Sequence, residues 1–380
     1  MAGPQRTAHG MMHTVELHRH FEAGIRPETI ARLAARHGLT EVRGRSGVVV
    51  PGADPQDPAS IRRYYDSVAA GFGAPDGFPR FTDSFGLPLS VLRSLEDLEE
   101  AVFDQLVDCA AIGSLHTELR GSPFTYQEQI AEPVEEIAVA LVRGVDRAWA
   151  ERAVSGTFIL AFSRQKGLGP PGAPPVQRQA AVVARLAAEL HRSDRPVGLD
   201  IAGFPETAHP PRAFDDALAP AREAGVPLTV HAGEQGRPPE FTDAPPALII
   251  EAVERLGATR IGHGTSLAAS AEARRLLRER GVGVECCPVS NAKMGFMPVA
   301  DHPLPLLLRE GLIVSLATDD PLMFGPFTVA ETFDAIAAPL RLSAADLLTL
   351  TRNGIESAFV TDARRARLRH QLEDRLRNNH

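Results

Sequence analysis

The chain has 380 residues, of which 44% are hydrophobic and 23% are charged, a composition typical of a globular protein with a large core. Its formal net charge of −8 argues against nucleic-acid binding, and it has no run of about 18 apolar residues that would span a membrane. The stretch from Met1 to His13 lacks the apolar segment of a secretory signal, and three cysteines are too few for a disulfide framework. We therefore expect a cytoplasmic enzyme that acts on a small molecule.

Eight short β-branched runs alternate with longer Ala- and Leu-rich helical patterns, which is typical of parallel βα units. Apolar spacings of three and four are clearest in Val176–His191, Ala247–Leu256 and Ala269–Arg280. The pattern predicts a (β/α)8 TIM-type barrel, one domain over residues 1–380, with an open doubly wound sheet as the alternative. The predicted strands are Thr14–His18, Ser114–Leu119, Thr157–Phe162, Val197–Ile201, Leu228–His231, Thr259–Gly262, Val282–Cys286 and Ile313–Ala317.

Two segments interrupt the repeat, and we expect both to be lids over a binding site. The first, Glu41–Pro88, follows the first strand, is rich in Gly, Pro and Asp, and contains a short helical pattern near Ser60–Ala70. The second, Gly167–Pro175, follows the third strand. The apolar residues of the first segment would close over a ligand or pack onto the barrel helices; they are Phe72, Phe78, Phe81, Phe85 and Leu87. Ala344–Leu376 is predicted to be helical with a solvated Arg-rich face.

Residues that bind metals collect where the predicted strands end. His18 and His20 lie two apart at the end of the first strand, so both imidazoles face the same side. His231 ends the fifth strand, His263 follows the sixth, and Asp319 follows the eighth. Because barrel active sites lie at the carboxyl ends of the strands, we expect these residues to converge. Three His and one carboxylate would suit a divalent ion that also holds a water.

The remaining polar residues at these strand ends would supply acid–base chemistry. Glu234 follows His231 past a glycine, and His263 lies between two glycines, where the backbone approaches a ligand closely. Some of these residues also have an ordinary structural explanation. His231 would be a hydrogen-bonded core histidine, and either Asp319 or Asp320 would be a helix N-cap. These alternatives would have to account for every placement at once.

Eight motifs in this order resemble the adenosine/adenine deaminase family of the amidohydrolase superfamily. They cover nearly the whole chain and read VELHRHFEAGIRPETIARLA, HTELRGSP, GLDIAGFPE, VHAGE, RIGHGT, VECCPVSN, SLATDDP and TRNGIESAF. The resemblance implies hydrolytic deamination of a 6-aminopurine nucleoside, adenosine-like to inosine-like plus ammonia. It also implies that one zinc ion per chain is bound by His18, His20, His231 and Asp319.

The resemblance further implies which residues contact the purine. Glu234 would protonate ring N1, His263 would orient the attacking water and accept its proton, and Asp320 would hydrogen-bond N7. The backbone at Gly203 would meet the other ring edge, and Glu22 would meet the N9 side, with His20 also next to the substrate.

Two features point to different substrates within this family. Glu22 replaces the Asp that adenosine-specific members typically carry, whereas Ala202-Gly203 keeps the pattern of nucleoside deaminases. The alternatives are therefore an adenine (free base) deaminase or a deaminase of a modified adenine nucleoside such as aminodeoxyfutalosine. The oligomeric state and pathway stay open.

Two other classes of protein are less consistent with the sequence. Barrel amidohydrolases that cleave amides or esters usually carry a Lys-bridged two-metal centre, and neither Lys166 nor Lys293 ends a predicted strand. A non-catalytic binding protein derived from this fold would be expected to have lost a ligand or Glu234. Cys286 and Cys287 do not form the Pro-Cys-x-x-Cys motif of cytidine-deaminase-type zinc sites, so we interpret both as core or pocket-lining residues.

Overall fold

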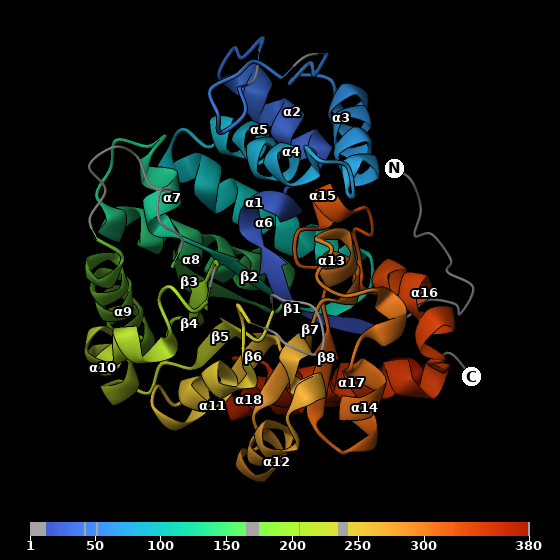
Figure 1. Ribbon diagram of the computed structural model, residues 1–380. Coiled ribbons are helices and arrows are strands. Elements are labelled where there is room, and N and C mark those ends of the chain that lie inside the picture. The colour runs from blue at the N-terminus through green and yellow to red at the C-terminus, as the bar shows by residue number, and fades with distance from the viewer. Residues whose placement is uncertain are drawn as a thin grey trace.

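The computed structural model describes residues 13–41, 43–50, 52–164, 175–204, 206–234 and 242–378. Within them, eight strands form one sheet in chain order from β1 to β8, surrounded by helices (Figure 1). The strands are β1 Thr14–His20, β2 Ser114–Gly121, β3 Gly156–Ser163, β4 Val197–Ala202, β5 Leu228–Ala232, β6 Arg260–His263, β7 Gly283–Cys286 and β8 Ile313–Leu316.

Every adjacent pair of strands is parallel, and the sheet curls until its two edges meet. The edges are joined by a parallel bridge between Arg19 and Asp319, where the His20 amide donates to the Asp319 carbonyl at 2.9 Å. The predicted (β/α)8 barrel is therefore confirmed, and the open doubly wound sheet is wrong. The carboxyl ends of all eight strands consequently lie at one mouth.

The outer layer consists of helices that bury an apolar face against the strands. In α9, for example, Val183, Ala184 and Ala187 are fully buried. The helices are α1 Phe21–Gly24, α2 Pro27–Arg36, α3 Pro58–Gly71, α4 Gly77–Ser84, α5 Gly86–Ser90, α6 Leu95–Ala111, α7 Pro123–Gln127, α8 Val134–Arg152, α9 Val176–Arg192, α10 Asp215–Glu223, α11 Pro246–Glu254, α12 Ala271–Arg280, α13 Pro288–Lys293, α14 Leu304–Arg309, α15 Pro321–Phe324, α16 Val329–Leu340, α17 Ala344–Ser357 and α18 Asp362–Asn378, with 3-10 turns η1 Pro211–Phe214, η2 Thr265–Ala269 and η3 Val299–Asp301. No helix in the described part of the chain is long and apolar enough to cross a membrane.

The segment Glu41–Pro88 contains the helix predicted near Ser60–Ala70, which is α3, and two further helices that its composition does not indicate. Asp57 accepts hydrogen bonds from the Ala59 and Ser60 amides, and Pro58 occupies the first helical position, so α3 begins there. Together, α3, α4 and α5 form a helical cap beside α15 (Figure 1). Of the second predicted lid, residues 167–174 lie outside the described residues.

The C-terminal region forms two helices instead of one continuous helix. Ser343 caps α17 through a reciprocal hydrogen-bond pair with Asp346, and α18 starts at Asp362. Leu368 and Leu372 of α18 are buried in a small cluster with residues of β1 and β2, so this helix packs on the barrel. The predicted solvated Arg-rich face is confirmed only in part, because Arg369 and Arg377 are exposed whereas Arg365 donates to the Ile355 and Ala358 carbonyls.

Candidate active site

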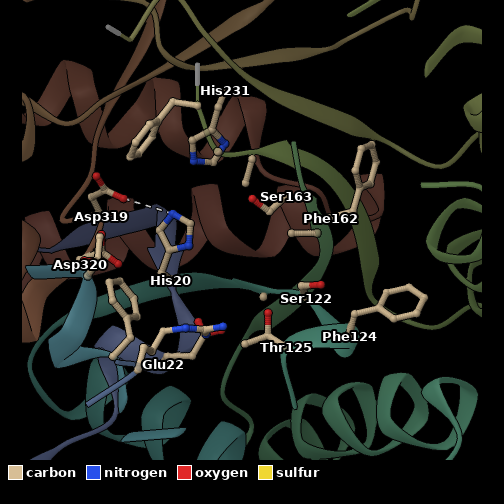
Figure 2. Close-up of a pocket in the computed structure, with 18 of the residues that line it drawn as sticks. His20, Glu22, Ser122, Phe124, Thr125, Phe162, Ser163, His231, Asp319 and Asp320 are labelled. Carbon is tan, nitrogen blue, oxygen red and sulfur yellow. Dashed lines mark ion pairs between the residues drawn. The ribbon is translucent and has the colours of Figure 1, made fainter. Parts of the chain in front are cut away.

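The four predicted ligand residues converge at the mouth of the barrel. Nε2 of His20 lies 3.3 Å from Oδ1 of Asp319 (Figure 2), and Nε2 of His18 lies 3.5 Å from the same oxygen. The rings of His18 and His231 are centred 4.6 Å apart. One nitrogen from each of His18, His20 and His231 lies within 4.8 Å of the other two. Residues from β1, β5 and the end of β8 thus enclose one point.

The donor atoms around this point fit a divalent metal. Nε2 of His18 is buried and makes no hydrogen bond, which is costly for a polar atom unless a ligand pairs with it. Nδ1 of His18 donates to Glu285 at 2.7 Å, and Nδ1 of His231 donates to Asp200 at 3.1 Å. Because Nδ1 carries the proton, the Nε2 lone pair of each ring is free to bind a metal. Burial lowers the pKa of His231 to about 4, so its ring is neutral at pH 7.

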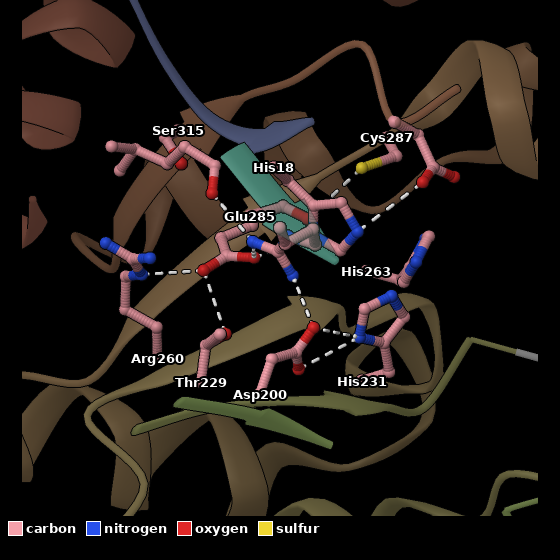
Figure 3. Close-up of polar contacts among 12 residues, drawn as sticks. His18, Asp200, Thr229, His231, Arg260, His263, Glu285, Cys287 and Ser315 are labelled. Carbon is pink, nitrogen blue, oxygen red and sulfur yellow. Dashed lines mark hydrogen bonds and ion pairs between the residues drawn. The ribbon is translucent and has the colours of Figure 1, made fainter. Parts of the chain in front are cut away.

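Figure 3 shows Asp200 beside His231 and Glu285 beside His18, and Arg120 bridges these two carboxylates. Arg120 donates through Nη1 to Asp200 at 3.0 Å and through Nη2 to Glu285 at 2.8 Å. Arg260 donates to the other oxygen of Glu285 at 2.6 Å. Although burial raises the pKa of Glu285, these guanidinium groups hold it well below its usual range. Arg120, Asp200 and Glu285 are fully buried.

This network was not predicted from the sequence. The feature that could have indicated it is a set of charged residues inside otherwise apolar strands, as in the letters ELRG, GLDIA and VECC. Burying such groups is unfavourable unless they are paired, so their presence in strands indicates an interior polar cluster.

Two of the predicted site residues adopt strained backbone conformations. His263 and Asp319 have φ angles of 64° and 65°, in the left-handed region that non-glycine residues rarely adopt. A Cβ on Gly262 would lie 2.9 Å from Cε1 of His18, so the glycine allows β6 to approach the metal-binding histidines. The hydroxyl of Ser290 donates to Asp319 at 2.5 Å and fixes its carboxylate.

Glu234 and His263, the predicted acid and base, lie next to each other near the predicted metal ligands. Oε1 of Glu234 lies 3.7 Å from Nε2 of His263, and both side chains are buried. Burial, helped by the negative charge of Asp319, raises the pKa of Glu234 well above its usual value. Burial also holds the pKa of His263 well below its usual value. Both shifts favour the uncharged forms, a protonated carboxyl group at Glu234 and a neutral imidazole at His263.

The predicted substrate contacts line the same cavity. Asp320 occupies the N-cap position of α15, yet its side chain caps nothing and its Oδ1 is buried without a hydrogen bond. Gly203 has a φ of 86°, which places backbone at the pocket wall. Glu22 accepts a hydrogen bond from the Tyr126 hydroxyl at 2.9 Å, and burial raises its pKa.

The cavity has a volume of about 550 Å³ and is lined mainly by apolar surface. Phe81 and Phe85 of the helical cap reach it, and the Phe81 ring stacks on Phe324 with centroids 5.3 Å apart. At the rim, Arg45 pairs with Glu128 at 3.2 Å. The other predicted lid residues lie elsewhere: Leu87 is fully buried, Phe72 packs beside Phe324, and Phe78 is 44% exposed.

Cys287, which the sequence indicates is a core or pocket-lining residue, lies close to the predicted metal ligands. Its Sγ lies within 4.8 Å of donor atoms of His18, His263 and Asp319. Burial raises the pKa of this thiol well above its usual value, so it stays protonated and lacks the thiolate that binds metals. Lys293 does not reach the site, because it donates to the Ala69 carbonyl at 2.9 Å.

Comparisons with known proteins agree with this geometry. A family model described as adenosine deaminase matches residues 14–375. The chain is 28% identical to an adenosine deaminase from Shewanella denitrificans, covering 93% of this chain and 96% of that one. It is 31% identical to an adenine deaminase from Streptomyces coelicolor, covering 94% and 93%. The crystal structure of adenine deaminase from Arthrobacter aurescens superposes with a TM-score of 0.75 at 27% identity, over 96% of this chain and 99% of that one.

Proposed function

Since this chain belongs to the adenosine deaminase family of hydrolases that act on C–N bonds, we propose that it deaminates a 6-aminopurine nucleoside with the help of one zinc ion. The products would be the corresponding 6-oxopurine nucleoside and ammonia. The observation that carries the proposal is that the four proposed metal ligands lie beside the buried Glu234–His263 pair at the mouth of the barrel.

The proposed metal ligands are His18, His20, His231 and Asp319. Imidazole nitrogens and a carboxylate oxygen are ligands that zinc accepts readily, and in two of the three imidazoles Nδ1 faces a carboxylate, which leaves Nε2 for the metal. When bound, a zinc ion supplies Lewis acidity that makes water a stronger nucleophile at neutral pH.

The reaction requires a proton at ring N1 and a group that accepts a proton from the attacking water. The raised pKa of Glu234 favours its protonated form, which would donate to N1 and make C6 electrophilic. His263 is neutral and would take the first proton from the water as its oxygen bonds to C6. Of the two protons of the water, one leaves with ammonia as the C6–N bond breaks. The other returns to Glu234, while the proton that Glu234 donated stays at N1.

Asp320 and Gly203 would hold the purine in place for this chemistry. Burial and the neighbouring Asp319 raise the pKa of Asp320 well above its usual value, which favours the protonated carboxyl group that would donate a hydrogen bond to N7. The cavity walls are mainly apolar, which suits the faces of a purine and excludes water.

A second candidate is a larger adenine nucleoside, such as aminodeoxyfutalosine. Two features favour it: the cavity of about 550 Å³ and the Arg45–Glu128 pair on its wall, which would provide polar contacts for a group attached to the sugar. The third candidate, adenine itself, would leave much of this cavity unfilled.

A spectrophotometric assay of the zinc-loaded protein with adenosine, adenine and larger 6-amino nucleosides tests the proposal. We expect release of ammonia from a nucleoside at a higher kcat/KM than from adenine. Preference for adenine by a wide margin would replace the nucleoside with the free base, and no turnover of any 6-aminopurine would refute the proposal.

A further inference from the structure

Glu206 lies in the loop after β4, is fully buried, and has no part in the chemistry described above. Its Oε2 accepts a hydrogen bond from the Gly233 amide at 2.8 Å, and its Oε1 accepts one from the Glu234 amide at 2.9 Å. A single carboxylate thus binds two consecutive backbone amides, at the residue proposed as the general acid and at the residue before it.

The backbone at this point makes a sharp turn that needs such support. Gly233 has a φ of 72°, and a Cβ there would lie 2.4 Å from the Ser266 hydroxyl oxygen. Successive amides in a turn with positive φ point to the same side and form a concave site for an anion. In this chain a side-chain carboxylate fills that site.

The carbonyl groups of the same turn are held by other loops. Arg164, which follows β3, donates to the His231 carbonyl at 2.9 Å. The Ser266 amide donates to the Gly233 carbonyl at 2.9 Å, and Thr265 contacts the carbonyls of Gly233 and Glu234. The turn after β5 is therefore held by residues that follow β3, β4 and β6. Among the described residues, Glu206 is the only side chain that accepts hydrogen bonds from the Gly233 and Glu234 amides.

We propose that Glu206 is a positioning residue that holds the Gly233–Glu234 turn and thereby aims the Glu234 carboxyl group at the substrate. This inference rests on the proposed function, because it assigns a role relative to Glu234. The negative charge of Glu206 also contributes to the raised pKa of Glu234, in the direction that keeps the acid protonated. A displacement of about 1 Å at a reacting group can cost about 100-fold in rate, so small changes in this turn matter.

The choice of Glu at this position follows from the number of acceptors. A carboxylate has two acceptor oxygens, and both are used here. A Gln side chain offers one oxygen and one NH2 group, which would face a backbone N–H donor to donor. Glu206→Gln should therefore release one of the two amides, while Glu206→Asp keeps both acceptors on a shorter stem.

A double-mutant cycle with Glu234→Gln tests the proposal. In the wild-type background, we expect Glu206→Gln to lower kcat by about 10- to 100-fold with little change in KM or metal content. In the Glu234→Gln background, the same change should have little further effect, because the acid that Glu206 positions is already absent. Glu206→Asp should recover part of kcat. An equal loss of kcat in both backgrounds would overturn the proposal.

Asp97→Asn is the matched control. Asp97 is a fully buried carboxylate on α6, away from the cavity, and it accepts a hydrogen bond from the Arg93 backbone amide at 3.0 Å. This variant should lower stability without changing kcat.

Amide hydrogen exchange separates the positioning role from the proposed function. The Gly233 and Glu234 amides should exchange slowly in the wild type and faster in Glu206→Gln, while strand β5 stays protected. Unchanged exchange at both amides would overturn the proposal even if the enzyme deaminates adenosine. Conversely, a wild-type protein that turns over no 6-aminopurine would refute the function, while faster exchange in the variant would still support the hold on the turn.

Discussion

Replacing Arg120 with lysine should weaken metal binding although the residue touches no metal ligand. Arg120 bridges Asp200 and Glu285, the carboxylates that hold His231 and His18 through Nδ1. Lysine keeps the positive charge, so neither carboxylate loses its counter-ion, but a single ammonium group lacks the fork that reaches both. The two histidines would then be held less rigidly.

The size of the effect follows from the number of ligands affected. Loss of one outer partner of a ligand typically lowers metal affinity by about 10- to 100-fold. Because Arg120 holds the carboxylates behind two of the four proposed ligands, we expect zinc affinity to fall by about 100-fold, which corresponds to about 2.7 kcal/mol of binding free energy.

Competition with a chromogenic chelator measures the zinc affinity of the wild type and of Arg120→Lys. Arg260→Lys is the graded control, because Arg260 contacts Glu285 but not Asp200, and its loss of affinity should be smaller. The free energy of unfolding of each metal-free protein shows whether a variant is merely destabilised. Unchanged affinity in Arg120→Lys, or an equal loss in both variants, would refute the reasoning.

Three further predictions concern other parts of the molecule. Glu22→Asp should raise the kcat/KM ratio of adenosine over adenine, because a shorter side chain leaves room for a ribose. Tyr126→Phe is the control, since it removes the hydrogen bond to Glu22 without shortening Glu22, and an unchanged ratio in Glu22→Asp would contradict the proposal of a nucleoside substrate. Hydrogen exchange around Phe81 should slow when a tight inhibitor fills the cavity, and identical exchange would leave this ring a packing role only. Burial lowers the pKa of His302 from 6.5 to about 3, so only the unfolded chain takes up this proton between those values and stability falls as the pH drops. His302→Gln should therefore reduce the loss of unfolding free energy between pH 7.5 and pH 5 by about 2 kcal/mol, and an identical loss in both proteins would contradict this assignment.

The barrel and the positions of the site residues were predictable because strand ends in a parallel barrel share one mouth. His18 and His231 are far apart in sequence, yet the order of βα units brings their rings to 4.6 Å. The residues behind the site were less accessible. Glu206 and Arg120 each hydrogen-bond two groups whose positions depend on the folded backbone, and no spacing in the sequence identifies such partners. In the helical cap, α3 was predictable from its helical pattern, whereas α4 and α5 were not, because their composition indicates loops and neither begins with a side-chain cap.

The central claim is that four residues hold the metal while Glu234 acts on the substrate, and one measurement tests it most directly. Zinc content and adenosine turnover should be determined on the same preparation of Glu234→Gln, with Asp319→Ala beside it. The account predicts about one zinc per chain and at least about a 100-fold loss of kcat in Glu234→Gln, the lower end for a general acid. Loss of zinc from Glu234→Gln, or full zinc in Asp319→Ala, would contradict it.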